Sequence, residues 1–62
     1  MKEGDLVKLK SGGPQMVIIE DQGDNEFGHW FTCEYYDGVH QKKVDCLETS
    51  LVSITESDII NH

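Results

Sequence analysis

The segment 4–19, GDLVKLKSGGPQMVII, constrains the fold of this chain more than any other part of the sequence. In its first half apolar residues alternate with lysine, as in a strand that is buried on one face only. The second half is apolar on both faces, which is typical of a strand in the middle of a sheet. We therefore predict a half-buried strand over residues 6–10 and a central strand over residues 15–20.

A Ser-Gly-Gly-Pro break separates these two runs and predicts a structural loop at Gly12, Gly13 and Pro14. Glycine tolerates a positive φ, and proline has no N–H to donate to a sheet ladder. The neighbouring Lys8 and Lys10 suggest a comparison with phosphate-binding loops. Those loops lead into a helix, whereas this one leads into a strand, so we expect a turn without a ligand.

The middle of the chain predicts a hairpin. Residues 21–28 are acidic and polar and indicate a loop, whereas residues 29–36, HWFTCEYY, have the aromatic and β-branched character of a third strand. Asp37 and Gly38 form the strongest hairpin signal in the chain. Residues 39–45 follow as an edge strand, which two lysines protect from unwanted pairing and in which a bulge would reset the register.

The end of the chain predicts a closing strand and a tail. Residues 46–51 indicate one helical or 3₁₀ turn, and residues 51–54 indicate a fifth short strand. Five short strands with tight turns favour a small SH3-like barrel over residues 1–54, because closure removes exposed edges. The tail, residues 55–62, either forms one helical turn or is frayed. We expect the barrel interior to contain Val7, Leu9, Ile18 and Phe31.

Alternation along the third strand separates an inner from an outer face. The residues expected to point into the core are Phe31, Cys33 and Tyr35. The residues expected on the outer face are Trp30, Thr32, Glu34 and Tyr36. Trp and Tyr are enriched at the centres of protein interfaces, so the outer aromatic residues indicate a binding face unless the tail covers them.

The charge balance disfavours some partners. The 62 residues include 12 Asp and Glu against 5 Lys and no Arg, which gives a net charge of −7. Nucleic acids and anionic membranes attract clustered Lys and Arg, so both are disfavoured as partners. The negative charge serves solubility or, alternatively, forms an acidic face for a basic partner. A chain of this length buries only about 60% of its unfolded surface, which leaves little room for a deep catalytic pocket.

Cys33, Cys46, His29 and His40 are the candidate metal ligands and nucleophiles. Zinc sites usually take their ligands from close pairs in tight turns, whereas His29 and Cys33 on one strand lie roughly 13 Å apart. No oxyanion donor or orienting group accompanies either thiol. We therefore expect no metal, no cofactor and no catalytic residue in a protein that is not an enzyme. No secretory or membrane-spanning segment is apparent, so we expect a cytoplasmic protein whose two thiols are free by default. The alternative is a disulfide, which requires that the two Cα atoms lie within about 7 Å of each other.

Three segments, GDLVKLKSGGPQM, TCEYYDG and LETSLVSI, resemble the YodC-like family of small uncharacterised bacterial proteins. The resemblance extends over residues 3–54, and the matching residues are Gly4, Asp5, Val7, Leu9, Ser11, Gly12, Gly13, Pro14, Met16, Cys33, Tyr35, Tyr36 and Gly38. It implies a small barrel in a bacterial or phage cytoplasm and transfers no activity. The acidic segment 21–28 and the tail after Ile54 depart from the family pattern, which leaves the partner open.

These observations predict a non-enzymatic protein-binding module or subunit, with self-association as one option. The predicted contact residues are Asp24, Glu26, Phe27, Trp30 and Tyr36. The alternative is a KOW-like nucleic-acid or ribosome-associated barrel, because GDLVKLKSG resembles the KOW element. That alternative requires four lysines on one face: Lys8, Lys10, Lys42 and Lys43.

Overall fold

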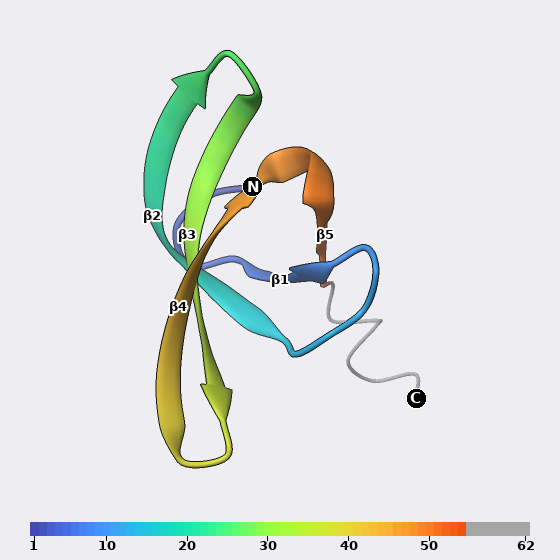
Figure 1. Cartoon of the computed structure of the whole chain (residues 1–62), viewed down its shortest axis with the longest axis vertical. Helices are drawn as coiled ribbons and strands as arrows, with labels where there is room; N and C mark the ends of the chain where they lie inside the picture. Colours follow the sequence, from blue (N-terminus) through green and yellow to red (C-terminus); the bar gives the residue numbers. More distant parts are fainter. Residues whose placement is uncertain (55–62) are drawn as a thin grey trace.

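The computed structural model describes residues 1–54, which form five antiparallel strands and one 3₁₀ turn. The elements are β1 (Leu6–Leu9), β2 (Met16–Asn25), β3 (Gly28–Asp37), β4 (His40–Leu47), the 3₁₀ turn η1 (Glu48–Ser50) and β5 (Leu51–Ser53). The strands form one sheet in the order β4-β3-β2-β1-β5 (Figure 1). The all-β prediction is therefore confirmed. The predicted tail, residues 55–62, lies outside the described residues.

β1 connects the long β2–β3–β4 ribbon to the last strand. Val7 of β1 lies opposite Met16 of β2 and opposite Ser53 of β5. The chain passes from β1 to β2 through the Ser-Gly-Gly-Pro segment, where Gly12 and Gly13 have φ values of +103° and +113°. Side chains disfavour this backbone conformation, so glycine allows the chain to turn here.

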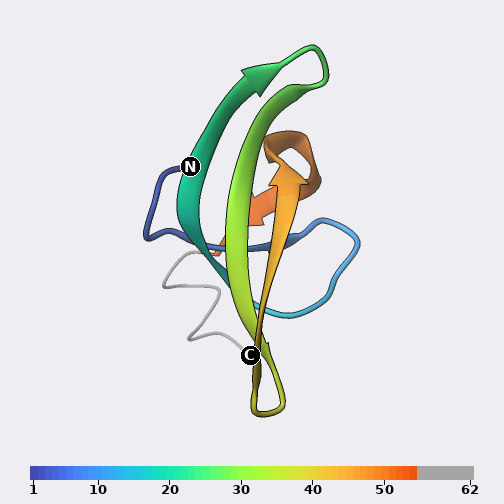
Figure 2. The same cartoon turned by 60° about the vertical axis from the view of Figure 1, so that its left-hand side comes forward.

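The core lies between the curved ribbon and the shorter elements. Figure 2 shows that β2 and β3 curve together, with η1 and β5 on their concave side. The buried apolar residues are Val7, Met16, Ile18, Phe31, Cys33, Cys46 and Leu51. Leu9 and Tyr35 are partly buried and pack against this cluster. The predicted interior is thus confirmed for Val7, Ile18 and Phe31, while Leu9 lies at the margin.

The predicted loop over residues 21–28 is wrong, because β2 continues to Asn25 and β3 begins at Gly28. Shifts in register accompany this extension, between Ile18 and Glu20 and again between Asp21 and Gly23. The extended hairpin passes beyond the core, so polar side chains on both of its faces meet water. Backbone pairing satisfies its N–H and C=O groups regardless of side-chain polarity.

β4 ends later than the predicted segment 39–45 and pairs with β3 without a register shift. Its pairing begins with Asp37 opposite His40 and continues to Trp30 opposite Leu47, so the expected bulge is absent from this strand. Within residues 1–54, β4 and β5 are the two edges of the sheet. In the same range, no helix has the length and apolar character required to cross a membrane.

Candidate functional site

The β2–β3 hairpin forms one end of the molecule, and the β3–β4 hairpin forms the other end (Figure 1). Phe27, in the turn between β2 and β3, is 70% exposed. The side-chain oxygen of Asn25 accepts a hydrogen bond from the backbone N–H of Phe27 at 2.8 Å. This bond orders the turn and fixes the backbone that presents the aromatic ring.

A chain of hydrogen bonds crosses the outer face of the ribbon at Thr32. Gln22 Nε2 donates to Thr32 Oγ1 at 2.7 Å, and Thr32 Oγ1 donates to Asp45 Oδ1 at 2.7 Å. Gln22 Nε2 also donates to Glu20 Oε2 at 3.1 Å. The chain links β2, β3 and β4, and it shields the hydroxyl so well that Thr32 is only 9% exposed. Thr32 lies on the outer face as expected, but its neighbours bury it.

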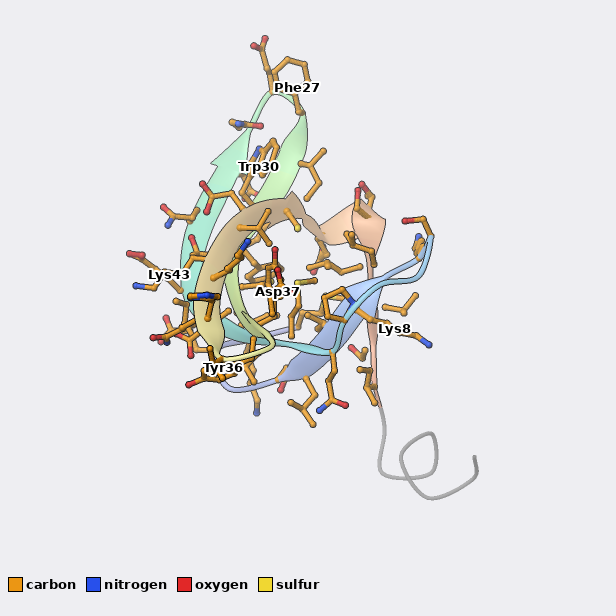
Figure 3. The ribbon with its side chains drawn as sticks, turned by 60° about the horizontal axis from the view of Figure 1, so that its bottom comes forward. Lys8, Phe27, Trp30, Tyr36, Asp37 and Lys43 are labelled. Carbon is orange, nitrogen blue, oxygen red and sulfur yellow. The ribbon has the colours of Figure 1, made fainter. Side chains whose placement is uncertain are left out.

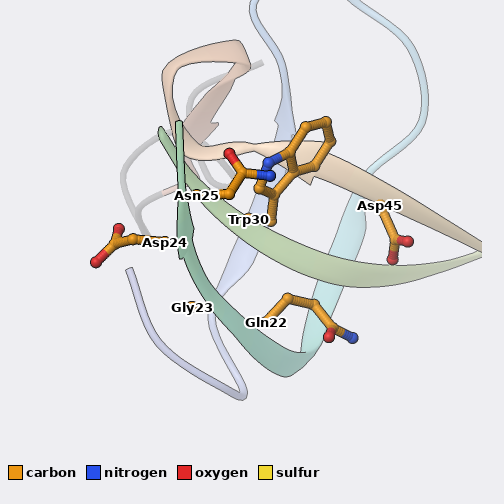
Figure 4. A pocket seen from close by; sticks show the side chains of 6 residues that line it. All are labelled: Gln22, Gly23, Asp24, Asn25, Trp30 and Asp45. Atoms are coloured by element: carbon orange, nitrogen blue, oxygen red, sulfur yellow. The ribbon is translucent and has the colours of Figure 1, made fainter. Parts of the chain in front are cut away.

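A pocket of about 320 Å³ lies next to this chain of hydrogen bonds. Its lining residues are Gln22, Gly23, Asp24, Asn25, Trp30 and Asp45 (Figure 4). Trp30 is half-buried, and its indole Nε1 is buried without a hydrogen-bond partner among the described residues. Such an unsatisfied donor costs about 1–3 kcal/mol, so hydrogen bonding does not account for tryptophan at this position.

The opposite face of the same hairpin is held by His29. Its Nε2 lies 2.6 Å from Asp21 Oδ1, and its Nδ1 lies 2.7 Å from Asp24 Oδ1. The ring also packs at a tilt against Phe31, with 4.8 Å between ring centroids. Figure 4 shows the Asp24 side chain directed away from the indole, and its carboxylate is bonded to His29.

These contacts shift two pKa values in opposite directions. The hydrogen bond with Asp24 raises the pKa of His29, the bond and charge of Asp21 add to the effect, and desolvation opposes it. The pKa of Asp21 is lowered chiefly by the hydrogen bond from the Gly23 backbone N–H, at 2.9 Å, with a further contribution from His29. The protonated His29 ring therefore binds the carboxylates of Asp21 and Asp24 at the same time and holds β3 against this part of β2.

The predicted contact residues fall into two separate places. Figure 3 places Phe27 and Trp30 towards one end of the molecule and Tyr36 towards the other. Tyr36 is 65% exposed, but it lies six positions from Trp30 along β3, a span of roughly 20 Å. Trp30 and Tyr36 therefore do not adjoin each other on the outer face. Glu26 lies exposed in the turn beside Phe27.

The structure adds four residues that the sequence did not single out: Gln22, Gly23, Asn25 and Asp45. Asp45 lies opposite Thr32 and Leu47 lies opposite Trp30. The signal that places Asp45 at the pocket is the register between β3 and β4, which the ambiguous alternation of residues 39–45 did not reveal. Gln22 and Asn25 belong to the segment that was predicted to be a loop.

The two cysteines are free and buried. Register places Phe31 opposite Cys46, while Cys33 lies opposite Val44. Burial raises the pKa of Cys33 to about 11, and the charges of Cys46 and Asp45 add to the shift. Burial also raises the pKa of Cys46. Both thiols are thus protonated at neutral pH and are poor nucleophiles. Residues 1–54 contain no group of three or more His, Cys, Asp or Glu side chains placed to hold a metal ion.

The lysines that the nucleic-acid alternative requires lie on different strands. Lys8 belongs to β1, whereas Lys42 and Lys43 belong to the edge strand β4. Figure 3 shows Lys8 and Lys43 on opposite sides of the molecule. Lys42 Nζ also lies 3.4 Å from a carboxylate oxygen of Asp37. The fold therefore adds no support to that alternative.

A family model described as an uncharacterized small protein, DUF2158, matches residues 2–52. The match includes the whole β2–β3–β4 ribbon and both sides of the pocket. No curated protein and no solved structure matches the chain.

Proposed function

We propose that this chain, which belongs to the DUF2158 family of uncharacterized small proteins, is a non-enzymatic module that binds another protein through the end of its β2–β3 hairpin. The contact surface, here called the hairpin face, consists of Glu26, Phe27, Trp30 and the pocket beside Trp30. The observation that supports this proposal best is the exposed Phe27 on an ordered turn, next to a half-buried tryptophan.

The energetics of folding do not explain Phe27. A side chain that is 70% exposed contributes little to the core, and serine would serve the turn at least as well. Aromatic side chains at interfaces supply a large apolar area with few rotatable bonds, and they dominate the binding energy of many complexes. An exposed phenylalanine beside a pocket that contains tryptophan therefore favours recognition of a protein.

The test compares two exposed aromatic residues at opposite ends of β3. The tagged wild-type protein, Phe27→Ser and Tyr36→Ser are used to retain partners from a bacterial lysate, and circular dichroism verifies that all three are folded. We expect a partner that the wild type and Tyr36→Ser retain equally and that Phe27→Ser loses. A partner retained equally by all three, or no specific partner, would refute the assignment to the hairpin face.

We also propose that the sheet closes into the SH3-like barrel expected from the sequence. The strand order β4-β3-β2-β1-β5, the curvature of the ribbon and the position of η1 before β5 support closure. The Ser-Gly-Gly-Pro-x-Met block supports a place among YodC-like proteins of the bacterial cytoplasm, and the free thiols suit a reducing compartment.

A further inference from the structure

We infer that the pocket beside Trp30 binds the guanidinium group of an arginine side chain on the partner protein. This inference rests on the proposed function, because it names the group that the hairpin face recognises. It is drawn from the aromatic ring, from the direction of the hydrogen bonds around the pocket and from the absence of arginine in this chain.

The indole of Trp30 provides an apolar and electron-rich wall. Cations bind over the face of tryptophan better than over any other aromatic side chain. Among residues 1–54, no cation–π contact occupies this ring. The pocket has the size of the smaller ligand sites in proteins, which suits one long side chain.

Two lining residues, Gln22 and Asp45, each keep an acceptor oxygen that their hydrogen bonds do not use. The amide NH₂ of Gln22 donates to Glu20 and to Thr32, so the amide oxygen of Gln22 remains as an acceptor. The Thr32 hydroxyl donates to Oδ1 of Asp45, and within residues 1–54 the second carboxylate oxygen accepts no hydrogen bond. The hydrogen bonds run in one direction, from the Gln22 amide to the Thr32 hydroxyl to the Asp45 carboxylate. The acceptors left over therefore favour a ligand that donates hydrogen bonds.

The charge around the pocket selects a cation. Glu20 and Asp45 lie on either side of Thr32 in the register of the sheet, so two carboxylates belong to the outer face, and Asp45 also lines the pocket. No lysine or histidine belongs to the lining residues. A guanidinium group fits better than an ammonium group, because its planar fork stacks on an aromatic face while its edge donates to a carboxylate.

The composition of the chain determines the source of the ligand. The sequence contains no arginine, and its last eight residues, TESDIINH, contain no lysine either. Neither the C-terminal segment nor a second copy of this chain can supply a guanidinium group. The occupant is therefore a different protein. The net charge of −7 on this chain would attract a partner with a basic surface.

The test uses Trp30 fluorescence, because Trp30 is the only tryptophan in the chain. The full-length protein is titrated with acetyl-Gly-Arg-Gly-amide at matched low ionic strength, and with peptides in which lysine or the uncharged isostere citrulline replaces arginine. We expect a saturable change with the arginine peptide, weaker binding of the lysine peptide and none of the citrulline peptide. Equal responses to arginine and citrulline, or no saturable response, would overturn the inference. Lysine binding as tight as arginine binding would overturn the choice of guanidinium.

Two variants distinguish binding at the pocket from attraction of the peptide by the overall negative charge of the protein. Asp45→Asn keeps the shape of the side chain and its hydrogen bond with Thr32 but removes the negative charge. We expect it to lower the affinity for the arginine peptide about tenfold. Glu3→Gln removes the same charge outside the pocket and should leave the affinity unchanged. If both variants weaken binding equally, the pocket is not the site.

The outcome is distinguishable from that of the proposed function. If Phe27→Ser loses a protein partner while the arginine peptide leaves Trp30 fluorescence unchanged, the hairpin face is an interface but the pocket is not an arginine site. If the arginine peptide binds to the wild type, Asp45→Asn weakens that binding, and no partner depends on Phe27, then arginine binding at the pocket is supported and the hairpin face is refuted as a protein interface.

Discussion

Thr32 provides the sharpest test of how the fold positions the pocket. Its hydroxyl accepts from Gln22 and donates to Asp45, and both of these residues line the pocket. Thr32→Val replaces the hydroxyl with a methyl group of similar size in a strand position that suits valine. The substitution therefore removes two hydrogen bonds and changes little else.

The expected cost follows from the exposure of the partners. A hydrogen bond contributes about 0.5–1.5 kcal/mol when neutral and about 1.5–3 kcal/mol when one group is charged. Gln22 and Asp45 are exposed and regain water when they lose Thr32, so the lower part of these ranges applies. We expect a loss of about 1.5 kcal/mol in the free energy of unfolding. For a domain of this size, the Tm then falls by about 6–12 °C.

A double-mutant cycle isolates the bond between Thr32 and Asp45. Thr32→Val, Asp45→Ala and the double variant are unfolded in urea, and the coupling between the two changes is calculated. We expect a coupling of about 1 kcal/mol, together with weaker binding of the arginine peptide by Thr32→Val. Additive effects of the two substitutions, with peptide affinity unchanged, would show that Thr32 neither bonds to Asp45 in solution nor positions the pocket.

Four further predictions follow from single residues. The pKa of His29 is raised above 6.5 and that of Asp21 is lowered below 3.8, so the contact between them weakens as pH rises through the raised pKa of His29 and as it falls through the lowered pKa of Asp21. The protection factors of the hairpin amides, which correct for intrinsic exchange, should therefore be highest between about pH 4 and 6.5, and His29→Gln should remove their decrease on the alkaline side. Cys33 should resist iodoacetamide at pH 8 until urea unfolds the chain, and rapid labelling of the native protein would contradict its burial. Phe31→Ala should cost about 3–5 kcal/mol, comparable with the whole stability of such a core, so its circular dichroism should show an unfolded chain. Gly38 has a φ of +68°, so Gly38→Ala should lower stability by about 1 kcal/mol in urea unfolding, whereas asparagine should be tolerated better.

The elements that depend on local pattern could be predicted from the sequence. Alternation in residues 6–10, the double-sided apolar run before Glu20 and the Asp-Gly turn predict strands and turns that the fold contains. These signals are local, because the side-chain period of a strand and the φ preference of glycine act over a few residues. The acidic segment 21–28 misled the prediction, since polar composition is typical both of a loop and of a hairpin that extends into water.

The candidate site could be predicted only in part. The sequence identified Phe27 and Trp30 by residue type, and it separated the inner from the outer face of the third strand. It grouped Tyr36 with Trp30 because both share a face, although distance along the strand separates them. The sequence did not identify Asp45, because its position beside the pocket depends on the register between β3 and β4. The alternation of residues 39–45 leaves that register ambiguous.

The sequence by itself determined where the five strands lie, apart from the extension of β2 to Asn25, and that Val7, Ile18 and Phe31 belong to the core. It also determined that the chain is acidic without arginine. Only the tertiary structure decided that Gln22, Thr32 and Asp45 meet beside Trp30. The physical reason is register: strand propensity depends on neighbouring residues, whereas a shift of one position between strands exchanges the residues on each face.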